Sequence, residues 1–296
     1  VRLSPPAQAT PTAEERTPTA SPESATPTTE AQQTTTTEVS LGSAVIRDNF
    51  ARSDQLFVNL ANLPPLEPGQ VYAGWLAGYE GTLLQPIGAI PVDAEGKAQL
   101  TFDAPSRANL LADYDGFILT IEQEPIPESP SSPFLSWSQV SLNVMEYIRR
   151  LLVSSPDTPE NVGLAIGLVE QVGEVVREAQ YARDSAQAAD LDGIKQRAEQ
   201  IILLIEGPGG PNYRDLDGDG EILDPGDTFG LLEGEGQVGY VQAVAEAAKG
   251  ASEAAFANEV TKLHSRHVQD AAANTGSWLI EVRDTALTIF EENDLS

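Results

Sequence analysis

Gln70-Val-Tyr-Ala-Gly-Trp-Leu-Ala-Gly-Tyr79 is the stretch that decides the fold. Val71, Ala73 and Trp75 alternate along it, and a period of two is typical of a β-strand. Further short runs of this kind are separated by turn residues: Thr36–Ile46, Gln55–Leu60, Thr82–Val92, Lys97–Asp103, Asp115–Gln123 and Phe134–Leu142. About seven short strands in succession predict an all-β sandwich over residues 41–142.

Two connections support these strands. Asp93-Ala-Glu-Gly96 lies between two runs and predicts a hairpin turn with Gly96 in the left-handed conformation. Leu63–Gly69 contains three prolines and predicts a rigid loop.

Residues 143–296 carry the periodicity of helices instead. Spacings of three and four over Pro159–Ala189 predict a helix, with Thr158 as its cap and Pro159 in its first turn. Its expected buried seam is Ala165, Leu168, Val172, Val175, Ala179, Ala182, Ala186 and Ala189. The other expected helices are Asn143–Ser154, Asp190–Glu206, Gln237–Asn274 and Gly276–Asn293. We therefore expect a four- or five-helix antiparallel bundle and, overall, an α+β multidomain chain.

Residues 1–40 differ from the rest of the chain. They contain 11 Thr, 6 Pro and 4 Ser. This composition is typical of surface stalks and linkers, and its Thr and Ser side chains are acceptors for O-linked glycans. We expect an extended Thr/Pro-rich arm, ordered in the assembled protein if glycans or a neighbouring subunit hold it.

The acidic loop 207–236 contains the one motif with recognisable chemistry. Its spacing, D-x-D-x-D-G-x-I from Asp215 to Ile222, is that of the first eight positions of an EF-hand-type calcium loop. Alternate carboxylates converge, Gly220 permits the bend, and Ile222 is expected to anchor the loop to a core. The candidate Ca²⁺ ligands are Asp215, Asp217, Asp219, Glu221 through its carbonyl, Asp224 and Asp227.

The motif departs from an EF-hand at its end. Position twelve, normally a bidentate carboxylate, is Gly226, so that Asp224 or Asp227 would have to close the shell. The alternative is a solvated acidic turn without an ion. Asn212–Gly236 holds eight acidic residues and one Arg, and this net charge of −7 favours a bound cation.

The overall composition excludes several function classes. The net charge of −28 opposes nucleic-acid binding, and the lack of Cys excludes disulfides and thiolate chemistry. No apolar run is long enough to span a membrane. His264 and His267 lie three residues apart, but without further ligands we expect partly buried bundle-edge residues rather than a metal site. No catalytic motif is present, and we predict that the chain is not an enzyme.

Resemblances of the two halves of the chain to known families indicate where the protein is located. Residues 42–133, through Leu63–Leu76, Ile87-Gly88, Asp93–Gly96, Tyr114-Asp115 and Leu119–Glu122, resemble the extracytoplasmic C-terminal domain of the anti-sigma-K factor family. The helical half resembles an uncharacterised surface-protein module of filamentous bacteria, through Ile148–Leu152, Ala198–Ile201, Ile205–Gly207, Asp215–Asp227 and Phe229–Leu232. The resemblances imply a protein outside the cytoplasmic membrane.

The sequence thus predicts a secreted or cell-surface structural protein stabilised by Ca²⁺. Its partners would be other copies or other surface proteins, and the arm would build a fibre or surface assembly by adding Thr34–Leu41 to a neighbour's sheet. The alternatives are a sensor domain of an anti-sigma-factor-like membrane protein and an enzyme acting on polysaccharide or peptide.

Overall fold

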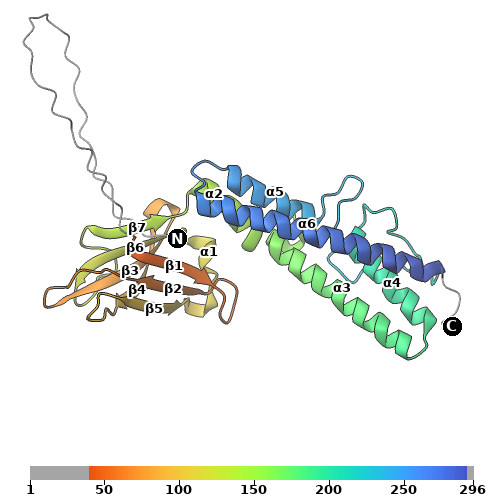
Figure 1. Ribbon diagram of the computed structural model, residues 1–296, viewed down its shortest axis with the longest axis horizontal. Coiled ribbons are helices and arrows are strands. Elements are labelled where there is room, and N and C mark those ends of the chain that lie inside the picture. The colour runs from red at the N-terminus through yellow and green to blue at the C-terminus, as the bar shows by residue number, and fades with distance from the viewer. Residues whose placement is uncertain (1–39, 292–296) are drawn as a thin grey trace, which may run out of the picture. The chain divides into compact units, whose positions relative to one another are not determined.

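The computed structural model describes residues 40–291 and shows mixed α and β structure (Figure 1). These residues fall into two compact units. The β unit contains the described residues up to Leu110 and Gly116–Gln139, and the helical unit contains Leu111–Asp115 and the described residues from Val140 onward. A short helix, α1 (Leu110–Asp113), lies at this junction. The predicted α+β class is therefore confirmed.

The β unit consists of two antiparallel sheets with three and four strands. The first has the order β1-β2-β5, formed by Gly42–Arg47, Gln55–Leu60 and Ala98–Asp103. The second has the order β4-β3-β6-β7, formed by Leu83–Ile90, Gln70–Gly78, Gly116–Gln123 and Phe134–Gln139. All seven predicted strands are present. Residues 36–39 of the first predicted run lie outside the described residues.

Strand β3 is the centre of the larger sheet, hydrogen-bonded to β4 on one side and β6 on the other. The sequence predicts one buried face, and Ala73 and Trp75 are indeed fully buried. The other face is buried as well, because Tyr72 and Leu76 are only 1% exposed. The Trp75 indole N–H donates to Thr120 Oγ1 at 2.9 Å, which satisfies its only polar group.

The predicted turn at residues 93–96 is present, but it does not join two paired strands: β4 and β5, on either side of it, belong to different sheets, and an isolated antiparallel bridge joins Val92 to Ala98. Gly96 has φ +75°, and its N–H donates to the carbonyl oxygen of Asp93 at 3.1 Å. The Asp93 carboxylate accepts hydrogen bonds from the backbone N–H groups of Glu95 and Lys97. A side chain at Gly96 would lie 2.7 Å from the Leu63 carbonyl oxygen, which fixes glycine here.

Glu122 is a buried carboxylate at the end of β6, only 2% exposed. It accepts hydrogen bonds from the backbone N–H and hydroxyl of Ser131 and from the hydroxyl of Ser132. Burial by itself raises the pKa of Glu122, but the hydrogen bonds from Ser131, Thr120 and Ser132 outweigh it and lower this pKa below its usual value. Glu122 therefore fastens the segment before β7 to the sheet as a charged group.

We expect Glu122→Gln to lower the free energy of unfolding by about 1–2 kcal/mol at pH 7, because charge-assisted hydrogen bonds are lost. A pKa lowered by folding stabilises the protein above the unfolded pKa of about 4.3, and the benefit disappears as pH falls through the folded pKa. Denaturant unfolding at pH 7 and below pH 4 should therefore show the difference shrinking in acid. Glu128→Gln, at an exposed residue nearby, is the control. A difference independent of pH would contradict the assignment.

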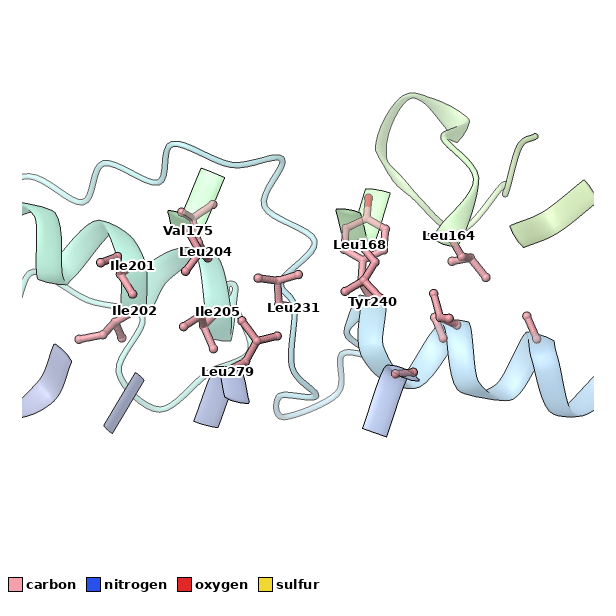
Figure 2. Close-up of a cluster of buried hydrophobic side chains, with 14 of the residues drawn as sticks. Leu164, Leu168, Val175, Ile201, Ile202, Leu204, Ile205, Leu231, Tyr240 and Leu279 are labelled. Carbon is pink, nitrogen blue, oxygen red and sulfur yellow. The ribbon is translucent and has the colours of Figure 1, made fainter. Parts of the chain in front are cut away.

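The helical unit contains five long helices. They are α2 (Leu142–Leu152), α3 (Leu164–Gln187), α4 (Leu191–Glu206), α5 (Tyr240–Glu253) and α6 (Glu259–Thr288). Figure 2 shows their shared core, in which side chains of α3, α4, α5 and α6 surround Leu231 of the long α4–α5 connection. Within residues 40–291, no helix is both long and apolar enough to cross a membrane.

The C-terminal half of α4 contributes a continuous buried segment to this core. Its predicted stripe of Ile194, Ala198, Ile201 and Ile205 is buried, and Ile202, Leu203 and Leu204 are buried too. Asp190 caps the helix by accepting a hydrogen bond from the Gly193 N–H at 3.0 Å. Residues 198–206 are all buried, Glu199 and Glu206 included, so neighbouring elements surround this half of the helix.

Two predictions about α3 are wrong. Its start is Leu164, because Pro159–Asn161 forms a separate 3₁₀ turn in which Glu160 and Asn161 have positive φ. Thr158 does not cap α3, since its hydroxyl donates to the carbonyls of Ser155 and Val162. The predicted seam is buried or partly buried from Ala165 to Val175. Three of its later alanines are exposed to solvent instead: Ala179, Ala186 and Ala189.

The predicted break between the last two helices is also misplaced. Gly276 lies inside α6, where it is buried and a Cβ would approach Val241 of α5 to 3.1 Å. The chain breaks instead at residues 254–258, where Phe256 has φ +66° and Asn258 caps α6 through Thr261. Glycine at position 276 serves close helix packing and leaves the helix unbroken.

Candidate metal centre

The connection from α4 to α5 is fastened to the helical core at both ends. Gly207 ends α4 with φ +61°, and the N–H groups of Leu231 and Leu232 donate to the Ile205 carbonyl oxygen at 3.0 and 2.8 Å. Leu231 is fully buried. The connection therefore has fixed anchors, between which the acidic motif lies.

A second anchor pairs the middle of this connection with α5. The Tyr240 hydroxyl donates to the Asp227 carboxylate at 2.6 Å, and Asp227 also accepts from the Phe229 N–H. Burial, the hydrogen bond to Asp227 and the charges of Asp227 and Glu170 all raise the pKa of Tyr240 far above its usual value. Tyr240 is thus a permanent donor, and Asp227 is used as a structural acceptor.

The D-x-D-x-D-G motif curls around its own backbone. The Asp215 carboxylate accepts from the N–H groups of Gly218 at 2.6 Å and Gly220 at 3.0 Å. The Asp217 carboxylate accepts from the Asp219 N–H at 2.9 Å. Gly220 has φ +93°, so it provides the sharp bend expected from the sequence. This local geometry aligns Asp215 and Asp217 on the side of the turn that faces α4.

Glu199 of α4 meets the turn there. It is only 4% exposed, and one of its carboxylate oxygens accepts from the backbone N–H groups of Leu216 and Asp217. Glu199, Asp215 and Asp217 each place a carboxylate oxygen within 4.8 Å of the others. Three carboxylates at this separation form a set of hard oxygen ligands suited to a cation.

The electrostatics of Glu199 reflect this crowding. Burial raises its pKa, the hydrogen bonds from Leu216 and Asp217 oppose the shift, and the charges of Asp217 and Asp215 raise the pKa further. The pKa of Glu199 lies above its usual value as a result. A divalent cation among the three oxygens would replace this repulsion with attraction.

Glu199 was not predicted from the sequence. It belongs to a helix rather than to the loop, and its only signal is a glutamate two residues before the apolar run Ile201–Ile205. Spacing within the motif reveals ligands that are close in sequence. It does not reveal a ligand that the fold brings from another element.

The remaining predicted ligands lie outside this three-carboxylate group. Asp219 and Glu221 are exposed at the rim of the turn. The Asp224 carboxylate accepts from the Tyr213 hydroxyl at 3.3 Å and the Gly226 N–H at 2.8 Å. Asp227 is held by Tyr240, as described above. The structure therefore brings together two of the six predicted residues, Asp215 and Asp217, and adds Glu199.

Two further expectations about this half of the chain are wrong. Ile222 is 51% exposed and does not anchor the loop, whereas Leu216, the second residue of the motif, packs against the helical core. His264 and His267 are exposed rather than partly buried, with ring centroids 5.9 Å apart. The candidate metal group among residues 40–291 includes neither histidine.

Comparison with known proteins identifies no relative. No model of a protein family, no curated protein and no solved structure matches the chain. The two family resemblances of the sequence therefore stay predictions.

Proposed function

We propose that the chain is an extracellular or cell-surface structural protein whose helical unit is stabilised by one Ca²⁺ ion. The observation that carries this proposal is the meeting of buried Glu199 with Asp215 and Asp217 of the calcium-type motif. Asp219 and Glu221, next along the same turn, are available to complete the shell with the help of water. Oxygen-only ligands favour Ca²⁺ over softer metals.

The ion's role in this proposal is structural. The α4–α5 connection runs from Gly207 to Gly239 without helix or strand, so ordering it costs conformational entropy. A cation that links Glu199 of α4 to the turn at Asp215 would offset this cost through its bonds to the carboxylates and would neutralise part of the segment's net charge of −7. Binding to the folded state alone then adds stability by mass action.

The proposal assigns scaffold roles to both units. We propose that the two sheets pack as a sandwich and that helices α2 to α6 form an antiparallel bundle around the Figure 2 core. Residues 1–40, with glycan acceptors on Thr and Ser, would link copies or other surface proteins into an assembly. The composition supports this reading, and no catalytic role is proposed for any residue.

Thermal unfolding with calcium or with chelator tests the metal proposal. Extracellular calcium sites bind with dissociation constants of around 10⁻⁴–10⁻³ M. A CaCl₂ concentration of about 10 mM should therefore stabilise the helical unit by roughly 1.4–2.7 kcal/mol. The expected rise in its Tm, read by circular dichroism at 222 nm, is about 3–10 °C.

The substitution Glu199→Gln distinguishes the role of Glu199 as a metal ligand from its role as an acceptor of backbone hydrogen bonds. Its amide oxygen can still accept from the Leu216 and Asp217 N–H groups, so the variant should fold and should be as stable as wild type, or more so, in chelator. It should lose the response to Ca²⁺. Asp270→Asn, at an exposed residue of α6, is the matched control and should keep the full response. Equal Tm values for wild type in calcium and in chelator would contradict the proposal.

A further inference from the structure

The β unit carries an apolar groove that the calcium proposal does not use. It has a volume of about 470 Å³ and is formed along strands β3, β4, β6 and β7. Ala77, Leu84 and Ile118 line it, together with Phe134 and Trp137 of β7. We call this feature the aromatic groove.

The aromatic groove stands on a rigid base. Ala77 and Ile118 belong to the same buried cluster as Trp75, and Leu84 packs against this cluster. Ile118 pairs with Trp75 on one side and with Trp137 on the other, so the three side chains share one face of the sheet. The base is thus fixed before any ligand arrives.

The rim of the groove is exposed aromatic surface. Trp137 is 42% exposed and Phe134 is 40% exposed, and both belong to β7, the outer strand of the sheet. Natural proteins usually protect such edges with charges or covering segments. Aromatic residues that remain exposed on an edge beside a groove mark an interaction surface.

One charge defines the chemistry of the groove. Among its lining residues only Glu80 has an acidic or basic side chain, and its carboxylate forms no ion pair with any residue in the range 40–291. Tyr79, Glu80 and Gly81 all have positive φ, at +49°, +59° and +83°. Non-glycine residues in this conformation are strained, and such strain gathers at ligand sites. The groove therefore suits a ligand that combines apolar rings with a positive charge.

The chain itself contains such a ligand outside the described residues. Arg2-Leu-Ser-Pro-Pro6 places an arginine three residues before a proline pair. Residues 1–13 contain Arg2 and no acidic side chain, although the whole chain has a net charge of −28. Proline-rich segments bind aromatic-lined grooves, because proline rings pack on aromatic faces and lose little entropy on binding.

We propose that the segment Arg2–Pro6 of one copy binds the aromatic groove of a second copy. Pro5 and Pro6 contact Trp137 and Phe134, and Arg2 pairs with Glu80. Residues 7–39, which separate the segment from the described residues, provide a contour length of roughly 110 Å, enough to reach another molecule. The contact is head-to-tail and repeats along an assembly. The inference rests on the proposed role of the arm in surface assembly and gives that role a specific site.

Sedimentation of the full chain in calcium buffer, over a range of concentrations, tests this contact. Wild type should self-associate. Trp137→Ala removes the main rim and Arg2→Glu reverses the pairing charge, and each should weaken association at least tenfold. Trp278→Ala, which removes a 64% exposed tryptophan from the helical unit, is the matched control and should associate as wild type does.

Complementation provides the decisive arm of the experiment. Trp137→Ala keeps an intact segment and Arg2→Glu keeps an intact groove, so their mixture should form 1:1 dimers that neither forms alone. Glu80→Arg combined with Arg2→Glu in one chain should restore association. A monomeric wild type, a mixture that does not associate, or unchanged association of Trp137→Ala would overturn the proposal. The calcium response of Tm is measured separately in the same variants, so failure of the contact is distinguishable from failure of the proposed function.

Discussion

Replacing Tyr240 with alanine is expected to lower the free energy of unfolding of the helical unit by about 4 kcal/mol. Tyr240 is fully buried, and its ring lies 4.5 Å from that of Phe229, centroid to centroid. A Cβ at Gly167 would lie 2.3 Å from this ring, so α3 packs directly on it. The substitution leaves a cavity between α3 and α5 and removes the donor to Asp227, which frees the connection that holds the candidate metal centre.

Denaturant unfolding followed at 222 nm measures this effect, since the long helices lie in the helical unit. Tyr240→Phe keeps the ring and removes only the hydroxyl, so it should cost about 1–2 kcal/mol. Tyr181→Ala, at a tyrosine 45% exposed on α3 whose ring contacts the Arg197 guanidinium, should cost no more than about 1 kcal/mol. If Tyr240→Ala cost no more than Tyr240→Phe, the ring would not be the core element described here.

The second large effect is expected in the β unit. Trp75→Ala should lower its free energy of unfolding by roughly 3–5 kcal/mol, because a fully buried indole is lost from the centre of the larger sheet. Thr120 is fully buried too and loses the indole donor 2.9 Å from its hydroxyl. The cavity and the lost hydrogen bond both destabilise the contact between the neighbouring strands β3 and β6.

Hydrogen exchange read by mass spectrometry measures this effect for each unit separately. Peptides from β3 and β6 should exchange much faster in Trp75→Ala, whereas peptides from α4 should keep their protection. Trp137→Ala, at an exposed tryptophan of the same sheet, is the control, and at a concentration at which the wild type is monomeric it should leave these rates nearly unchanged. Equal acceleration in both variants would contradict the distinct roles of the two tryptophans.

The strands were predictable because local signals and the fold agree. Alternating residues such as Val71, Ala73 and Trp75, with turn residues between runs, are sufficient to identify strands. The burial of Tyr72 and Leu76 on the other face was less apparent, since it depends on what covers β3 in the folded unit. Gly96 was predictable because a single backbone conformation determines its turn.

Helix boundaries were harder, because glycine has two meanings in a helical region. Gly276 suggested an end, but the structure uses it for the close approach of α6 to Val241. The real break at Phe256 and Asn258 carries a weaker sequence signal, one capping residue without glycine or proline. Tertiary packing decides whether such a glycine ends a helix or lies at a close helix contact, and a single sequence does not show this packing.

The candidate metal centre also combines residues that the sequence predicts with one that only the fold reveals. Asp215, Asp217 and the bend at Gly220 follow from spacing along the motif. Glu199 comes from α4, sixteen positions before Asp215, and only the fold brings it to the turn. The anchor was misassigned for a related reason, since Ile222 follows the EF-hand pattern but Leu216 is the residue that packs against the core.

Calorimetric titration of the metal-free full chain with Ca²⁺ tests the central claim most directly. We expect one site per chain, with a dissociation constant of around 10⁻⁴–10⁻³ M. Glu199→Gln, and the pair Asp217→Ala with Asp219→Ala, should abolish this binding, whereas Asp270→Asn should leave it intact. A flat titration of wild type, or undiminished binding in Glu199→Gln, would contradict a calcium site built from α4 and the acidic turn.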